Sequence, residues 1–305
     1  MARPRSARAQ RDRCLVASTR RIRPTLRQRV SRVDAIGTRK TCRCGVPGAT
    51  FFSVAALVFT FSAALTITRC ASMSALSDVP MPGGWMLSMM WIRMCGQTWR
   101  EVATSTLGMW IAMSIAMMLP SVTPTLWRYH RELASRTCVT RPGTLTMLVG
   151  VGYFLVWTLY GMVVLPPGIA LAALEMRVPL LARAVPFVST VVVLSAGVLQ
   201  FTAWKARHLA CCRRAPAGER ALSLINATTA WRQGVRLGVH CSYSCAGLTA
   251  ILLVSGTMDL RAMVAVTTAI AAERLAPDGE RVARAIGVVV IGAGLFLLAR
   301  AIRTG

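Results

Sequence analysis

The sequence predicts an all-α protein, a polytopic transmembrane helical bundle of six or seven spans. Of the 305 residues, 54% are hydrophobic, and the mean hydropathy is +0.53. Several apolar runs approach the length of roughly 20 residues that a bilayer-spanning helix needs. Such a chain is too apolar for an ordinary soluble domain, so we expect the lipid bilayer to be its main partner.

Two regions divide the chain. Residues 1–48 are rich in Arg with little apolar periodicity, which predicts a disordered tail, and residues 49–305 form the transmembrane domain. Residues 221–236 are weakly amphipathic and are expected on the inner surface. The expected spans are 49–68, 107–127, 144–165, 187–204, 239–257, 260–275 and 284–302.

The net charge of +25 predicts the orientation of the bundle. Much of it lies in the tail and in loops 128–142 and 205–236, whereas loops 69–106 and 166–186 carry far less. This is the positive-inside pattern of membrane proteins, not the basic groove of a nucleic-acid-binding protein. We therefore expect an N-terminal tail in the cytoplasm and no nucleic-acid partner.

Three motifs of known enzyme classes are absent from the sequence. Neither lysine, Lys40 nor Lys205, belongs to a GxxxxGK[ST] loop, so no phosphate-cradling ATP site is expected. There is also no HExxH and no GxSxG motif. The sequence favours a role other than catalysis.

Soft metal ligands gather at the ends of two neighbouring spans. His208 and Cys212 are four residues apart, and so are Cys241 and Cys245. On a helix this spacing places each pair on one face, and the short segment between the pairs keeps the two helices adjacent. Three sulfurs and an imidazole suit Zn²⁺, or Cu⁺ with fewer ligands used. The sequence therefore predicts a copper or zinc site at the cytoplasmic ends of two adjacent helices.

Three further residues are weaker ligand candidates. His240 precedes Cys241 on an adjoining face, and Cys211 is vicinal to Cys212 but points another way. Glu273, at the inner end of its span, is a candidate ligand, a hydrogen-bond acceptor for an imidazole, or a proton acceptor. The alternative for Glu273 is a salt bridge with Arg274 or with a basic loop residue.

Methionines recur every four residues at Met109, Met113 and Met117, on one face of a helix. Their thioethers are either soft ligands for Cu⁺ or fillers of gaps between helices. Cys70 and Cys95 are the only cysteines on the outer side, and a disulfide between them is expected if that compartment is oxidising.

Other side chains have structural interpretations. Asp259 is expected to cap a helix, and His130 is expected to be exposed in a loop. An aromatic packing face is expected from Tyr153, Trp157 and Tyr160.

Several motifs resemble those of one family. AMMLP at 116–120, GYFLVWTLYG at 152–161, a Q-x4-K-x6-C spacing, GVHCxxxCAGL, GTMDLRAM and AERLAP are similar to an uncharacterised bacterial family of predicted metal-binding integral membrane proteins. The resemblance covers about residues 105–300 and implies metal binding in a bacterial inner membrane, with no established activity. Members commonly carry Cys where this chain has His208 and Ser244, so fewer sulfurs are present here and the site is slightly less copper-like.

These patterns together predict a membrane protein for transport or handling of a soft metal. A thiol redox factor or a metalloenzyme assembly factor is one alternative, and a structural subunit without metal is another. A membrane partner protein or a homo-oligomer is compatible with each of them.

Overall fold

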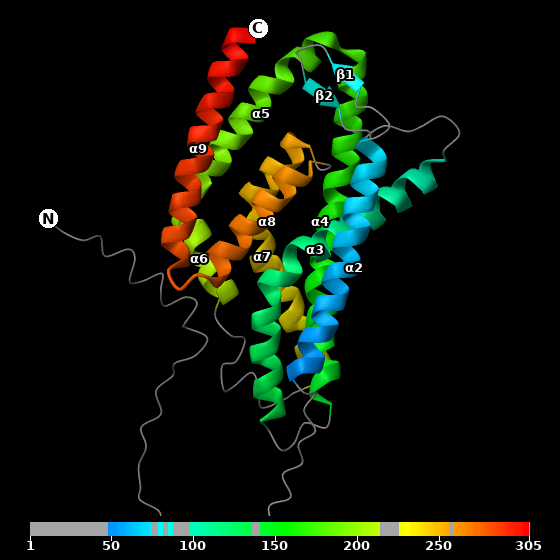
Figure 1. Cartoon of the computed structure of the whole chain (residues 1–305), viewed down its shortest axis with the longest axis vertical. Helices are drawn as coiled ribbons and strands as arrows, with labels where there is room; N and C mark the ends of the chain where they lie inside the picture. Colours follow the sequence, from blue (N-terminus) through cyan, green and yellow to red (C-terminus); the bar gives the residue numbers. More distant parts are fainter. Residues whose placement is uncertain are drawn as a thin grey trace, which may run out of the picture.

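The structure is a computed structural model that describes residues 48–74, 79–81, 85–87, 98–135, 141–213, 226–256 and 259–304. This part of the chain is almost entirely helical, so the prediction of an all-α bundle is confirmed (Figure 1). A short hairpin pairs its two strands antiparallel. The elements are α2 (Gly48–Ser74), β1 (Val79–Met81), β2 (Trp85–Leu87), α3 (Trp99–Ala134), α4 (Pro142–Arg177), α5 (Pro179–Leu199), α6 (Ala203–Arg213), α7 (Ala227–Ser255), α8 (Leu260–Leu275) and α9 (Gly279–Thr304).

Local sequence signals set the helix ends. Thr98 accepts a hydrogen bond from the Glu101 amide, and the Glu101 carboxylate accepts one from the Thr98 amide, which forms a capping box at the start of α3. Asp259 caps α8 as expected, because its side chain accepts bonds from the amides of Arg261 and Ala262. Gly256 ends α7 with a backbone φ of +104°, a conformation that residues with a Cβ rarely adopt.

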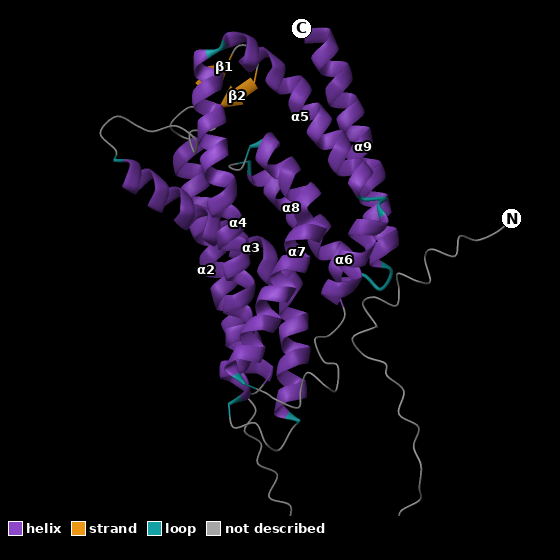
Figure 2. Cartoon of the chain, turned by 180° about the vertical axis from the view of Figure 1, so that it is seen from behind, coloured by secondary structure: helices purple, strands orange, loops and turns teal. Residues whose placement is uncertain are grey.

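Helix α7 lies inside the bundle. It packs against α4, α5, α6 and α8, while α2 packs on α3 and α9 packs on α5 (Figures 1 and 2). Figure 1 shows α3 changing direction midway, and Pro120 and Pro124 lie within this helix. The end of α3 and the starts of α4 and α7 lie together at the lower end in both views.

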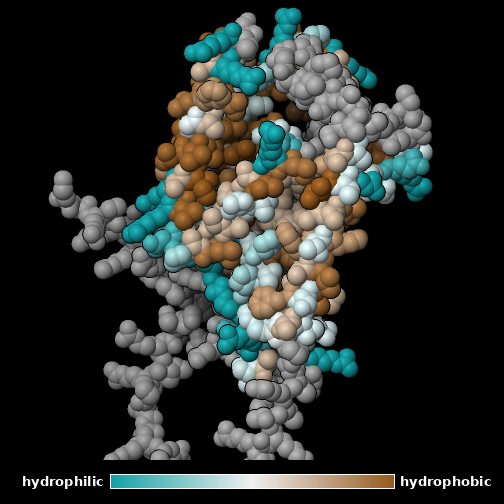
Figure 3. All heavy atoms as spheres, in the orientation of Figure 1, coloured by the Kyte–Doolittle hydropathy of each residue, from teal (hydrophilic) through white to brown (hydrophobic). Residues whose placement is uncertain are grey.

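Within the residues that the structure describes, six helices are long and apolar enough to cross a membrane: α2, α3, α4, α5, α7 and α9. The predicted span 260–275 corresponds to α8, which has only 16 residues and is not one of the six. Large apolar side chains cover the outside, and Val163, Leu180 and Val289 expose 70% or more of their surface. Figure 3 shows apolar atoms over the region of α5 and α9.

Two expected boundaries around the ligand-bearing segments are wrong. The span 187–204 was expected to be one helix, but tight i→i+3 backbone bonds of Phe201 and Thr202 separate α5 from α6 there. The segment 221–236 was expected to lie apart on the surface, yet residues from Ala227 onward form the first turns of α7. Cys241 and Cys245 therefore lie near the middle of a helix, not at its beginning.

Candidate metal centre

The crossing of α4 and α7 positions the centre. Gly152 on α4 and Gly234 and Gly238 on α7 face one another, and a Cβ at Gly238 would lie 2.9 Å from the carbonyl oxygen of Tyr153. The two glycines of α7 are four residues apart, the small-xxx-small spacing that lets helix backbones approach closely. This close approach brings the side chain of Tyr153 to the thiols of α7.

Two thiols lie on one turn of α7. The Sγ atoms of Cys241 and Cys245 are 3.9 Å apart, and these residues are 0% and 1% exposed. The phenol oxygen of Tyr153 lies 3.0 Å from the Cys241 sulfur. Two sulfurs that each bind one ion at about 2.3 Å can be at most about 4.6 Å apart. The pair can therefore hold one ion without movement of α7.

Helix α6 runs alongside α7, and two contacting pairs of residues share the same sequence offset of 32 positions. His208 Nδ1 lies 3.0 Å from His240 Nδ1, and Cys212 Sγ lies 4.0 Å from Ser244 Oγ. The repeated offset shows that α6 and α7 are locally parallel. His208 therefore faces the imidazole of His240 on α7.

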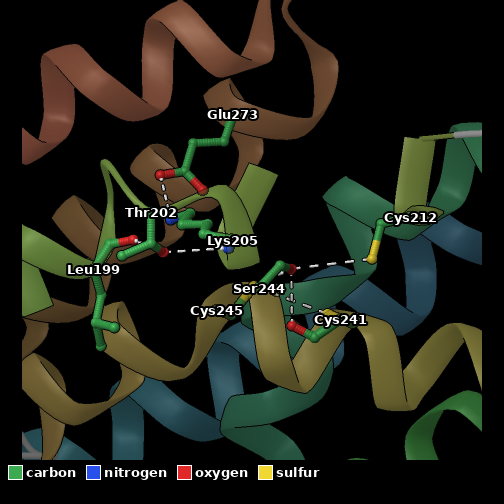
Figure 4. Close-up of polar contacts among 8 residues, drawn as sticks. All are labelled: Leu199, Thr202, Lys205, Cys212, Cys241, Ser244, Cys245 and Glu273. Atoms are coloured by element: carbon green, nitrogen blue, oxygen red, sulfur yellow. Dashed lines mark hydrogen bonds and ion pairs between the residues drawn. The ribbon is translucent and has the colours of Figure 1, made fainter. Parts of the chain in front are cut away.

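Cys212 is the third buried sulfur. Ser244 Oγ is 4.0 Å from the sulfur of Cys212 and 3.7 Å from that of Cys245, so the hydroxyl lies between the two thiols (Figure 4). Burial raises the pKa of the Cys212 thiol, and the positive charge of Arg274 acts in the opposite direction. We refer to Cys212, Cys241 and Cys245 as the sulfur group.

His208 and His240 form a second donor set, the histidine pair. Both side chains are half-buried, and the Trp204 and Tyr243 rings lie 4.8 and 5.1 Å from the His208 ring. Burial, reinforced by the charge of Arg207, lowers the pKa of His208. The imidazole is therefore neutral at neutral pH and keeps a lone pair for a metal.

Glu273 is engaged by a lysine in this structure. Its carboxylate is 2.9 Å from Lys205 Nζ, and both side chains are buried (Figure 4). Burial raises the pKa of Glu273, while the charge of Lys205 opposes this rise. This ion pair joins α6 to α8. It corresponds to the alternative that Glu273 forms a salt bridge, with Lys205 as its partner.

Arg274, which follows Glu273, was not recognised from the sequence as a site residue. One of its terminal nitrogens donates to the Ser121 hydroxyl at 3.3 Å. Its sequence signal is a basic residue near the end of an apolar segment. Such residues are often functional.

The structure thus divides the predicted ligands on α6 and α7 into two sets, the sulfur group and the histidine pair. Within the described part of the chain, no three side chains of His, Cys, Asp or Glu converge closely enough to hold one ion. Cys211 is less buried than Cys212. Met113 and Met117 are buried in the same core as the sulfur group, and Met109 packs against that core.

The structure tests one of two further expectations. His130 was expected to be exposed, but it is 2% exposed near the end of α3, where its ring stacks against those of Phe51 and Trp127. The predicted disulfide is not tested, because Cys95 lies outside the described residues.

The comparisons with known proteins give one match. A family model described as PpoB2: Copper chaperone matches residues 107–297, which is more than half of the chain and includes both donor pairs. No curated protein and no solved structure shows significant similarity to the chain. Membership of the matched family supports copper handling and gives no support to zinc. The chain therefore belongs to the PpoB2 copper chaperone family.

Proposed function

We propose that this protein is an integral membrane copper chaperone that holds Cu⁺ between the thiolates of Cys241 and Cys245. The observation that carries the proposal is the pair of buried sulfurs 3.9 Å apart on one turn of α7. Cu⁺ is a soft ion that favours thiolate ligands, and it uses fewer ligands than a tetrahedral Zn²⁺ site. Copper is the cargo here. Two donors suffice to hold it, and a labile third donor helps to release it.

The membrane setting is inferred from helix lengths and apolar surface. The 21 residues of α5 span about 32 Å, close to the thickness of a bilayer core of about 30 Å. Helix α6 follows immediately, so we place it at the inner boundary of the membrane, facing the cytoplasm. The 36 residues of α4 span about 54 Å and project beyond that boundary, as do the basic first turns of α7.

The histidine pair then lies on the route between the cytoplasm and the sulfur group. Its half-buried imidazoles are one helical turn from Cys212 on α6 and next to Cys241 on α7. Imidazole binds copper, although it is a harder ligand than thiolate. We assign His208 and His240 to the exchange of copper and the more deeply buried thiols to its retention.

The test is a Cu⁺ titration of the purified full chain in detergent micelles under reducing, anaerobic conditions. The Cys241→Ser/Cys245→Ser variant is expected to lose tight binding of one Cu⁺, because hydroxyls are poor ligands for a soft ion. Cys70→Ser is the matched control, since Cys70 is an equally buried cysteine on α2. His208→Asn/His240→Asn should retain the bound ion but transfer it more slowly to a chromogenic chelator.

The proposal fails if the double serine variant binds Cu⁺ as tightly as the wild type. It also fails if mass spectrometry finds Cys241 and Cys245 oxidised to a disulfide in cells grown with copper. That second result would favour the thiol redox alternative.

A further inference from the structure

The sulfur group is divided into a close pair and a separate thiol. The sulfurs of Cys241 and Cys245 are 3.9 Å apart, and Cys212 is buried in the same core. Within the described part of the chain, however, no three potential ligands converge on one point, so Cys212 does not join the pair. A group that lies between them must keep the third sulfur apart.

The hydroxyl of Ser244 is this group. Ser244 Oγ lies 4.0 Å from the sulfur of Cys212 on α6 and 3.7 Å from that of Cys245 on its own helix, α7. Figure 4 shows the side chain of Ser244 directed toward Cys212. Ser244 is only 2% exposed, so its oxygen is a fixed part of the core between the two thiols.

A backbone hydrogen bond holds the hydroxyl in this place. Ser244 Oγ donates its hydrogen to the carbonyl oxygen of Cys241 at 2.9 Å, within the same turn of α7. Because that hydrogen is engaged, the oxygen faces the two thiols with its lone pairs and can accept from their S–H groups. A hydroxyl oxygen is a hard donor and a poor ligand for a soft ion. Ser244 therefore fills the position of a ligand without acting as a thiolate.

The number of sulfurs that meet decides between copper and zinc. A structural Zn²⁺ site is closed by four ligands, whereas Cu⁺ is held by fewer. A sulfur in place of the Ser244 oxygen would lie about 4 Å from the sulfurs on either side, within the limit of about 4.6 Å for two sulfurs on one ion. Such a sulfur would connect Cys212 to the pair and complete a set of four thiols. The oxygen leaves only two thiols together.

We propose that Ser244 determines the metal specificity of the centre, because its hydroxyl keeps Cys212 out of the site and so prevents a closed four-thiolate zinc site. This inference rests on the proposed copper site at Cys241 and Cys245. The two remaining thiolates suit Cu⁺ and leave it exchangeable. The geometry thus reverses the expectation that a sulfur missing at position 244 makes the site less copper-like.

The experiment adds one sulfur to the full chain, purified in detergent under reducing conditions. Ser244→Cys is compared with Ser242→Cys, which adds a thiol to the same helix at a hydroxyl that is also bonded to a backbone carbonyl, that of Gly238. Residues two apart point about 200° away from each other around a helix, so the control directs its sulfur elsewhere. Zn²⁺ affinity is measured by chelator competition. The number of thiolates on Cd²⁺ is measured by the intensity of the sulfur charge-transfer absorption.

Ser244→Cys is expected to raise Zn²⁺ affinity by about a hundredfold or more and to increase the Cd²⁺ absorption per ion, because four thiolates replace two. It should also release Cu⁺ more slowly to a chromogenic chelator. Ser242→Cys and Ser244→Ala should stay within about threefold of the wild type for Zn²⁺, because neither adds a sulfur between the thiols. Equal Zn²⁺ affinities in the two cysteine variants would overturn the inference.

The wild type decides the question if Ser244→Cys does not fold. At saturating Cd²⁺, its absorption should correspond to two thiolates. An absorption of three thiolates would mean that Cys212 joins the pair past Ser244, and the inference would be wrong. Failure of the copper site itself is seen separately, because the wild type would then bind no Cu⁺ that depends on Cys241 and Cys245.

Discussion

Cys241 and Cys245 on α7 are at most 1% exposed, whereas His208 on α6 and His240, which directly precedes Cys241, keep part of their surface accessible. The thiols are positioned from within α7 and by its glycine crossing with α4. The imidazoles meet only because α6 packs on α7. Under the proposed function, retention of copper depends on the core of the bundle, and exchange of copper depends on how firmly the short helix α6 is attached.

The largest expected effect comes from detaching α6. Lys205→Met leaves Glu273 buried without its counter-ion and should lower the free energy of unfolding by about 3–5 kcal/mol near neutral pH. Because burial raises the pKa of Glu273, its charged form is the disfavoured one, so the loss should grow as pH rises and shrink as pH falls. Chemical unfolding of the full chain in detergent at several pH values measures this.

Arg284→Met supplies the control for the lysine variant. Arg284 and Glu280 are 2.6 Å apart but more than half exposed, and an exposed pair contributes less than about 1 kcal/mol. Equal destabilisation by the two variants would show that the Lys205–Glu273 pair does not anchor α6.

A smaller loss of stability is expected from a change at the crossing of α4 and α7, which positions the buried thiols. In Gly234→Ala the added Cβ would overlap the backbone of Val149, so α4 and α7 must separate. We expect a loss of about 1–3 kcal/mol in the free energy of unfolding and weaker Cu⁺ retention, with the histidine pair less affected. Thermal unfolding and Cu⁺ competition measure the two quantities.

The matched substitution is Gly292→Ala in α9, where a Cβ meets nothing within 4 Å. Alanine at an open helical position should be neutral or stabilising by up to about 1 kcal/mol. If both alanine variants bind and unfold alike, the close crossing does not position the thiols.

The fold was predictable because helix length and apolarity follow directly from composition, and six long apolar helices were within the expected number. The positions of the donors were less predictable. The spacing of Cys241 and Cys245 predicted their shared face, since the helical period fixes it. The break after Leu199 and the 32-residue register, which direct His208 to His240, depend on packing between helices and leave no periodic signal.

The contacts of Tyr153 and Arg274 likewise could not be predicted from the sequence. Tyr153 was interpreted as part of an aromatic face, and its hydrogen bond to Cys241 arises only from the glycine crossing. Arg274 was considered only as a partner for Glu273, because sequence adjacency suggested it. The structure instead pairs Glu273 with Lys205, 68 residues away.

The smallest expected effect is the pH dependence of the histidine pair in the metal-free protein. Burial lowers the pKa of His208 below its ordinary value, so the unfolded chain binds a proton more readily than the folded chain. Stability from this group is therefore present above about pH 6.5 and is lost as pH falls from there toward the folded pKa. After allowance for solvent screening, the change should be less than about 1 kcal/mol. His208→Asn should reduce the pH dependence of the unfolding midpoint between pH 5 and 7.5. Tyr243→Phe, which keeps a ring beside His208, should leave this pH dependence unchanged. An unchanged slope in His208→Asn would mean that protonation of this imidazole is not what distinguishes the accessible pair from the buried thiols.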